Sequence, residues 1–382
     1  MEELLGDGIF ITDGEMWKQQ RKLSSLEFAS RNLRDFSTTV FRDYALNLSG
    51  ILQSSSIYNE QIDMQVGFGV EIGTLAYELP DNRFANAFEY ASSTVTYRFV
   101  NPLWRFKRFL NVGSEALFVQ SIQVIDEFTY KLIHKRKAEL QKAVQEAKST
   151  SNNVYKLKHD LLSRFIELSE NPHSNLTDKI LRDVIINFVL AGRDTTAATL
   201  SRSIYMLMIN PNIAEHIYTE LITFEENEVK EMTGYDPEHQ KSFAEKITQF
   251  ASLLTYDPKG ILEDDVLPDG TKVRAGGLMI TVPYVMGRVV YNWGPDATSF
   301  NPGRWLNEEG IFQSACPFKF TAFQAGPRTC LGKDSAYLQM KMTLAILCRF
   351  FNFHLTPNHP VKYTMMPSLT MEHGLKLTVT TR

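Results

Sequence analysis

The feature that most constrains this chain is a glycine-punctuated loop, from Phe323 to Gly332, that runs directly into a helix. Apolar residues recur at helical spacing after it, and neither Gly nor Pro falls between Lys333 and His354. The pattern therefore predicts that Cys330 lies in the first turn of a helix. Unpaired N–H groups and the helix dipole favour a thiolate there, and a thiolate can bind a metal.

The residues around Cys330 suit a flat, anionic ligand. Gly326 and Gly332 have no Cβ, so the backbone can approach such a ligand closely. Arg328 adds a permanent cation two residues before the cysteine. Taken alone, a cysteine is more often a small buried hydrophobe than a ligand. A zinc site that uses Cys348, His354 and His359 lacks a fourth ligand and the usual spacing, so chance is the better explanation of that cluster.

The spaced pattern F-x-x-G-x-R-x-C-x-G resembles the haem-binding signature of the cytochrome P-450 monooxygenases. The matching residues are Phe323, Gly326, Arg328, Cys330 and Gly332, followed by Ala336. The resemblance implies that the cofactor is haem b, that these six residues bind it, and that Cys330 is the ligand of its iron.

A long helix is predicted from Asp178 to about Ile209, after Thr177 and before Pro211. Glycine within a helix costs about 1 kcal/mol, so Gly192 at its middle indicates a purpose. The hydroxyl of Thr195 can bond the carbonyl of Ala191, which bends a helix and opens a groove. The run A-G-x-D-T-T resembles the oxygen-binding motif of the same family. It implies that Ala191 and Gly192 face the haem and that Asp194 and Thr195 deliver protons.

A helix after Asp13, its predicted N-cap, carries Trp17 and Arg21 on one face. By resemblance, this W-x-x-x-R pair holds a haem propionate. Further basic residues lie nearby: Lys18, Lys22, Arg31 and Arg34. They fit a docking surface for an NADPH-dependent reductase and fit a solvated helix face equally well.

The remaining pattern predicts a mainly α fold with small β-sheets, and the resemblance makes this a cytochrome P-450 fold. Helices are expected at 36–56, 82–101, 112–147, 211–224 and 240–254, a hairpin at 266–273, and strands from Phe351 to Arg382. We expect one domain over residues 1–382, with a mostly helical part at 1–255. Hairpins, the haem-binding loop and its helix make up residues 256–382.

The chain also departs from the family pattern. Members carry an N-terminal anchor and strands before the region that begins here, so we expect a shortened, incomplete version of the fold. A helix is abbreviated between Asp63 and Phe68, and the helix bearing Glu-x-x-Arg is missing near Tyr256. Arg304 should then lack its carboxylate, which would destabilise the core around it.

The resemblance, closest to the plant fatty-acid ω-hydroxylases, implies hydroxylation of a medium- or long-chain fatty acid with O2 and electrons from an NADPH-linked reductase. It also implies the cytosolic face of the endoplasmic reticulum membrane, although no run of about 18 apolar residues is present. Aromatic residues between Phe84 and Phe109 suit an apolar substrate, and core packing explains them nearly as well. The net charge of −4 gives no support for nucleic-acid binding, and the odd count of three cysteines argues against a disulfide framework.

Two rival functions stay open. The chain could be a catalytically inactive truncated isoform, or a gene-model fragment, that binds at most haem or a partner. A haem-thiolate isomerase or dehydratase is the other rival. Such enzymes usually lose the proton-delivering threonine, and Thr195 is present.

Overall fold

The computed structural model describes residues 1–65, 82–149, 161–170, 176–230, 257–364 and 368–382. The chain forms two compact units. Unit 1 contains residues 1–54, 66–197 and 334–346, and unit 2 contains residues 55–65, 198–333 and 347–382. The boundaries between them fall within or close to helices α3 (Arg31–Tyr58), α10 (Thr195–Ile209) and α15 (Lys333–Phe350).

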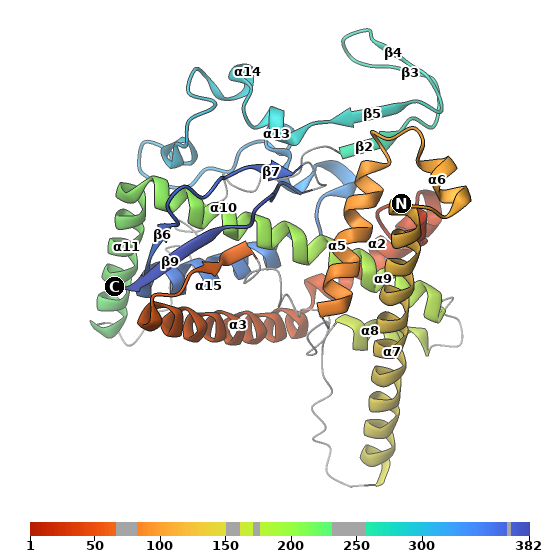
Figure 1. Cartoon of the computed structure of the whole chain (residues 1–382), viewed down its shortest axis with the longest axis horizontal. Helices are drawn as coiled ribbons and strands as arrows, with labels where there is room; N and C mark the ends of the chain where they lie inside the picture. Colours follow the sequence, from red (N-terminus) through yellow and green to blue (C-terminus); the bar gives the residue numbers. More distant parts are fainter. Residues whose placement is uncertain (66–81, 150–160, 171–175, 231–256, 365–367) are drawn as a thin grey trace. The chain divides into compact units, whose positions relative to one another are not determined.

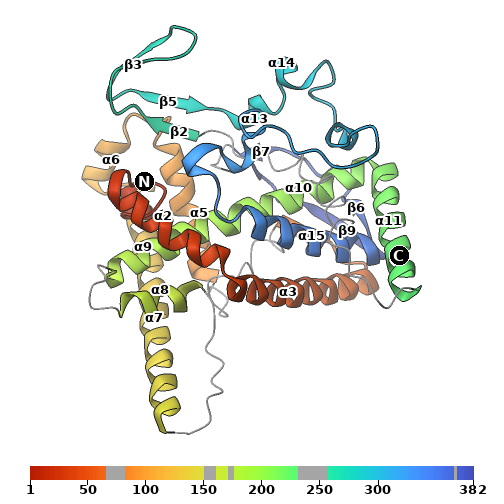
Figure 2. The same ribbon diagram turned by 180° about the vertical axis from the view of Figure 1, so that it is seen from behind.

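The described part of unit 1 is helical. Besides the first part of α3 it contains α1 (Glu2–Leu5), α2 (Gly14–Ala29), α5 (Asn82–Tyr97), α6 (Trp104–Leu110), α7 (Ser114–Ser149), α8 (Leu161–Ser169), α9 (Asp178–Val189) and the π-helix η1 (Leu190–Asp194). Helix α5 packs along α7, and α7 also contacts α8 and α9 (Figures 1 and 2). Helix α9 begins as predicted, because Thr177 is its N-cap and accepts a hydrogen bond from the N–H of Ile180 at 3.3 Å.

The core of unit 1 explains some of the aromatic residues that could have lined a substrate cavity. Phe84 and Phe88 are buried with their rings stacked at 5.8 Å, and Phe84 also contacts Phe128 at 4.6 Å. By contrast, Phe106 and Phe109 on α6 are 64% and 85% exposed. Core packing therefore accounts for the first pair, whereas Phe106 and Phe109 of α6 face outward.

The N-terminal segment is bound closely to α9 through two glycines. The backbone N–H of Asp7 donates to Asp183 Oδ2 at 2.9 Å, and Asn187 Nδ2 donates to the carbonyl of Leu5 at 2.9 Å. A Cβ on Gly6, where φ is +57°, would lie 2.0 Å from the Asp183 carboxyl group. A Cβ on Gly8 would lie 1.9 Å from the Asn187 amide. Only glycine fits at either position.

Unit 2 combines helices with short antiparallel sheets. Its strands are β1 (Ile62–Asp63), β2 (Asp257–Gly260), β3 (Asp265–Val266), β4 (Lys272–Val273), β5 (Leu278–Thr281), β6 (Phe351–Leu355), β7 (Tyr363–Thr364), β8 (Thr370–Met371) and β9 (Lys376–Thr381). Its helices include most of α10, α11 (Pro211–Lys230), α13 (Pro283–Met286), α14 (Val290–Trp293) and the 3-10 helices η3 (Pro302–Trp305), η4 (Thr321–Phe323) and η5 (Gly326–Arg328). The strand order β1-β9-β6 places Ile62 opposite Leu377 and Phe351 opposite Thr381.

These elements confirm the predicted class, mainly helical with small antiparallel sheets. The hairpin expected at 266–273 is β3 paired with β4, and strands follow Phe351 as expected. The helix expected at 240–254 and most of the abbreviated segment after Asp63 lie outside the described residues, and Asp63 itself belongs to β1. Among the described residues, no helix combines the length and apolar character needed to cross a membrane.

The expectation that Arg304 lacks a carboxylate is wrong. Its Nη2 lies 2.9 Å from Asp296 Oδ2, and its Nη1 donates to the carbonyl of Trp293 at 2.8 Å. Asn301 donates to the same carboxylate at 3.0 Å, and this bond followed by the charge of Arg304 lowers the pKa of Asp296. The loop 293–304 therefore supplies a local carboxylate to the guanidinium.

Candidate active site

The loop that contains Cys330 is closed by its own backbone. Helix η4 ends at Phe323, whose carbonyl accepts a hydrogen bond from the N–H of Cys330 at 2.8 Å. Between them, the hydroxyl and the N–H of Thr329 both donate to the carbonyl of Gly326, at 2.7 and 3.1 Å. These hydrogen bonds all join residues close in sequence.

The same loop stores backbone strain. Gln324 has φ +60° and ψ 176°, a region in which only glycine is comfortable. Gly326 also has a positive φ, +70°, and a Cβ there would meet no atom within 4 Å. Glycine is therefore needed at 326 for its backbone angle, and the space in front of it is open.

Cys330 does not lie in the first turn of α15, as the sequence predicted. The helix begins at Lys333, and its N-cap is Gly332, which has φ −84° and ψ 10°. A turn at residues 331–332 separates the cysteine from the helix, because the chain must first reverse out of the loop. Cys330 is exposed just before the N-terminus of α15. Within unit 2, the Cys330 thiol is therefore accessible to a ligand.

The other two cysteines differ from Cys330 in position or exposure. Cys316 is exposed but lies in the segment before η4, and Cys348 is buried on α15, where desolvation raises the pKa of its thiol to about 12. His354 Nε2 contacts the Thr380 hydroxyl at 3.1 Å, and His359 Nε2 contacts the Gly374 carbonyl at 3.0 Å. The zinc alternative gains no support from these side chains. None of the three cysteines forms a disulfide.

The middle of the long helix carries the predicted irregularity. Residues 190–194 form the π-helix η1, and the hydroxyl of Thr195 donates to the carbonyl of Ala191 at 2.5 Å. This confirms the hydrogen bond expected from the sequence. A π-helical turn is wider than an α-helical one and recurs at functional sites.

The side chains around the π-helical turn are more exposed than those before and after it. Residues 181–187 and 196–200 are fully buried, whereas 188–195 are only half-buried. A Cβ built on Gly192 would meet no atom within 4 Å. A half-buried stretch thus lies between two buried ones, and there is open space beside Gly192 within it. Ala191, Asp194 and Thr195 belong to the same stretch.

Asp194 has an unusual acidity for a carboxyl group. Desolvation raises its pKa to about 6, the charge of Arg193 opposes the shift, and Glu89 on α5 adds to it. The guanidinium of Arg193 lies 3.6 Å from the carboxylate, and 27% of the Asp194 side chain is exposed. Burial outweighs the nearby cation, so this group can change protonation near neutral pH.

Trp17 and Arg21 lie one turn apart on α2, as predicted, and both are half-buried. Between them, Gln20 is buried and donates to the carbonyl of Asp7 at 2.7 Å, which fixes the helix against the N-terminal segment. Asp13 occupies the N-cap position, although its side chain makes no capping hydrogen bond.

The predicted site residues divide between the units. Unit 1 holds Trp17, Arg21, Ala191, Gly192, Asp194, Thr195 and Ala336, and unit 2 holds Phe323, Gly326, Arg328, Cys330 and Gly332. Glu89, whose charge acts on Asp194, is not among the residues predicted from the sequence. No signal in the sequence pairs residues so far apart on different helices.

Comparison with known proteins agrees with these features. The family model described as Cytochrome P450 matches residues 2–379. Cytochrome P450 704B1 of Arabidopsis thaliana is 56% identical over all of this chain and 81% of its own length. Cytochrome P450 704C1 of Pinus taeda is 42% identical, with 79% of its length covered, and cytochrome P450 86B1 of Arabidopsis thaliana is 35% identical, with 72% covered.

The first of these alignments spans 425 residues, whereas this chain has 382, so at least 43 positions of the relative face gaps in this chain. The sequence analysis expected internal segments to be missing, and the gaps agree with that expectation. The family match extends over nearly the whole chain. This chain therefore belongs to the cytochrome P450 family of haem-thiolate monooxygenases.

Proposed function

We propose that this chain hydroxylates a medium- or long-chain fatty acid or a related lipid, with O2 and with electrons that a reductase delivers from NADPH. The observation that carries the proposal is the half-buried turn 188–195 in a helix that is buried on both sides. Open space beside Gly192 and a protonatable Asp194 next to it are what an oxygen-activating monooxygenase needs in this helix.

The described residues fit haem b. Cys330 is an exposed thiol before a helix N-terminus, and the space in front of Gly326 is open. When bound, haem supplies the iron that a thiolate ligates and the redox chemistry that activates dioxygen. Cys330 would hold the iron, and Arg328, Trp17 and Arg21 would bind the anionic propionates through charge and an indole N–H.

Thr195 and Asp194 would handle protons. The Thr195 hydroxyl donates to the Ala191 carbonyl, which fixes the position of the Oγ1 atom, a hydroxyl oxygen that can also accept hydrogen bonds. Asp194, with a pKa of about 6, can take a proton from solvent and release it at neutral pH. The adjacent positions of the two groups on one helix support a relay from solvent to the open turn.

An outward-facing apolar segment supports a lipid substrate and a membrane location. Phe99, Leu103, Phe106 and Phe109 are 50%, 62%, 64% and 85% exposed, and Arg105 lies exposed among them. Such a mixture of apolar and basic side chains suits the surface of a bilayer. We extend the proposal to the cytosolic face of the endoplasmic reticulum membrane, where a lipid substrate and a reductase would both be accessible.

One observation favours a second candidate, a catalytically inactive shortened isoform. At least 43 positions of a close relative have no counterpart here. Net stability of a domain is only about 5–15 kcal/mol, so the loss of one packed helix could remove most of it. Haem binding without turnover would be the result.

One experiment separates the two candidates. The 382-residue chain and a version with the missing segments restored are expressed side by side, loaded with haem and given reductase, NADPH and fatty acids of 12 to 18 carbons. The proposal expects a thiolate-ligated spectrum and hydroxylated product from both, with affinity rising about fourfold per added CH2, which corresponds to ~0.8 kcal/mol. Product from the restored version alone would support the inactive isoform. Binding of small polar compounds in preference to fatty acids would contradict the substrate class.

A matched pair of variants tests the membrane location. Phe109→Ser removes an exposed aromatic side chain from the apolar segment, and Phe318→Ser removes one that is 72% exposed in unit 2. Vesicles of phosphatidylcholine with phosphatidylserine should retain the second variant like the original chain and lose the first. Equal retention of both would contradict this surface.

A further inference from the structure

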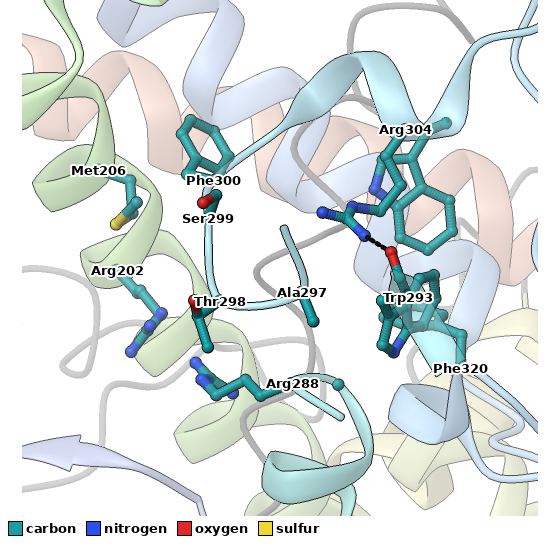
Figure 3. A pocket seen from close by; sticks show the side chains of 12 residues that line it. Arg202, Met206, Arg288, Trp293, Ala297, Thr298, Ser299, Phe300, Arg304 and Phe320 are labelled. Carbon is teal, nitrogen blue, oxygen red and sulfur yellow. Dashed lines mark hydrogen bonds between the residues drawn. The ribbon is translucent and has the colours of Figure 1, made fainter. Parts of the chain in front are cut away.

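A small polar cavity in unit 2 is separate from the residues assigned above. It has a volume of about 80 Å³ and is lined by α10, the loop 297–300 and residues near η3 (Figure 3). A single water needs roughly 10–15 Å³ by the same measure. The cavity therefore has room for several waters or for one compact polyatomic ion.

Two arginines meet at one side of this cavity. Arg202 on α10 and Arg288 both line this space, with Thr298 between them in the view of Figure 3, and the charge of Arg202 is near enough to act on Arg288. Burial lowers the pKa of Arg288, and the positive charge of Arg202 lowers it further. Two like charges in a partly desolvated space repel each other, so this arrangement needs a compensating charge.

The described residues supply aromatic rings and a carbonyl to the pair, but no carboxylate. The guanidinium of Arg288 lies 3.8 Å from the ring centre of Tyr284, and its Nη1 donates to the carbonyl of the same residue at 2.9 Å. Arg202 lies 5.1 Å from the ring centre of Tyr363. Its Nη1 is buried without a hydrogen-bond partner in the described structure. A carboxylate pairs with neither arginine among the described residues.

Across the cavity, Arg304 differs from these two arginines because it has a carboxylate partner. It binds Asp296 and the carbonyl of Trp293, so that carboxylate is already committed (Figure 3). The hydroxyl-bearing residues Thr298 and Ser299 also line the space. The cavity thus combines unused N–H groups, hydroxyl groups and an excess of positive charge.

We propose that this cavity binds a phosphate group between the guanidinium groups of Arg202 and Arg288. Planar guanidinium groups form paired, charge-assisted hydrogen bonds with tetrahedral oxyanions. The bound anion offsets the repulsion between the two arginines and supplies the acceptor for Arg202 Nη1. The cavity holds only the phosphate group itself, so the ligand is either free phosphate or the end of a phosphate monoester.

The test is a calorimetric titration of the full 382-residue chain with inorganic phosphate and, separately, with glycerol 3-phosphate, at constant ionic strength set with chloride. Saturable one-site binding is expected, with at least tenfold weaker binding in Arg202→Gln and in Arg288→Gln. Arg274→Gln removes one exposed positive charge from the same unit and should bind like the original chain. Binding of both compounds points to a monoester, and binding of phosphate alone points to the free ion.

Thermal unfolding gives a second readout that a purely structural role would not produce. Without phosphate, Arg202→Gln should melt at the same temperature as the original chain or higher, because one of two repelling charges is gone. Phosphate should raise the melting temperature of the original chain and of Arg274→Gln. It should not raise the melting temperature of Arg202→Gln or Arg288→Gln. No saturable binding to the original chain, or equal binding by Arg202→Gln and Arg274→Gln, would overturn the proposal.

Discussion

The loop around Cys330 and the helical turn around Gly192 are built in different ways. The loop 323–332 is closed by backbone hydrogen bonds between residues at most seven positions apart, and its residues are half-buried or exposed. The turn 190–195 takes its place from long stretches of buried helix on either side. The loop is a strained local structure that presents the thiol of Cys330. The helical turn is an opening between buried stretches of helix.

This difference predicts how each of the two responds to change. A substitution in the loop should alter ligand chemistry with little effect on the stability of the core, because few long-range contacts depend on it. A substitution in the helical turn should affect both proton transfer and stability, because Asp194 is partly desolvated within the core. The predictions below test this contrast.

The largest effect is expected at Cys330. Cys330→Ala removes the thiolate, so the reduced, carbon monoxide-bound chain should lose its haem-thiolate spectrum completely. Cys316→Ala is the matched control, because Cys316 is also exposed in unit 2. The free energy of unfolding of the apo chain should be nearly the same for both variants. Loss of the spectrum in Cys316→Ala instead would refute the assignment.

Thr195 should control how reducing equivalents are used. Thr195→Val keeps the shape of the side chain but removes the hydroxyl that donates to Ala191. In the version with the missing segments restored, this variant should still bind haem. The product formed per NADPH should fall about 100-fold, which is in the range of general acid–base effects, and the amount of peroxide should rise. Thr195→Ser should restore most of the product. Unchanged coupling in Thr195→Val would argue against the relay.

Asp194 should make the chain less stable as pH rises. Its folded pKa of about 6 exceeds the ordinary value of 3.8, so the folded state binds the proton more tightly. Its stabilising contribution is full below pH 3.8 and is lost as pH rises through 6. The loss amounts to roughly 1–3 kcal/mol. Asp194→Asn should therefore gain that much stability relative to the original chain between pH 4 and pH 7.

Urea unfolding at several pH values measures this difference. Asp178→Asn provides a control of opposite sign, because a hydrogen bond from Lys137 lowers the pKa of Asp178. The ionised Asp178 carboxylate stabilises the original chain at pH values above its ordinary pKa, and this stabilisation is lost as pH falls. Asp178→Asn should therefore be less stable than the original chain at neutral pH. Parallel pH profiles for Asp194→Asn and the original chain would contradict the prediction.

The smallest effect concerns the strained loop. Gln324→Gly relieves a positive φ of 60° and should stabilise the chain by about 1 kcal/mol, after allowing for the extra freedom of glycine in the unfolded state. The neighbouring Ala325 has an extended backbone with φ −135°, so Ala325→Gly should destabilise by about 0.5–1 kcal/mol. The same sign for both variants in thermal unfolding would show that the loop stores no strain.

Local patterns in the sequence were enough for much of this structure. The cap at Thr177, the hydrogen bond from Thr195 to Ala191 and the hairpin after Asp265 all depend on residues close in sequence, and all three are present. The position of Cys330 was placed one turn too far into α15, because a motif fixes residue order but not the backbone angles of the turn at 331–332.

Contacts between distant segments were beyond the sequence. Nothing near Gly6 indicates that Asp183 occupies the space where a side chain would stand. Asp296 lies only eight residues before Arg304 in the sequence, but the pattern alone does not single it out from other acidic residues as the partner of Arg304. The folded loop brings the two side chains together. Glu89 acts on Asp194 only because α5 lies close enough in space for its charge to be felt.

The π-helical turn at 190–194 has a consequence for how this part of the chain can change. A π-helical turn amounts to one residue inserted into an α-helix, so its loss by a single deletion leaves the helices on either side in register. A change of one codon could therefore close the opening beside Gly192 without disturbing the buried residues before and after it. In this helix, a mutation could therefore remove the opening that activity needs while the fold is kept.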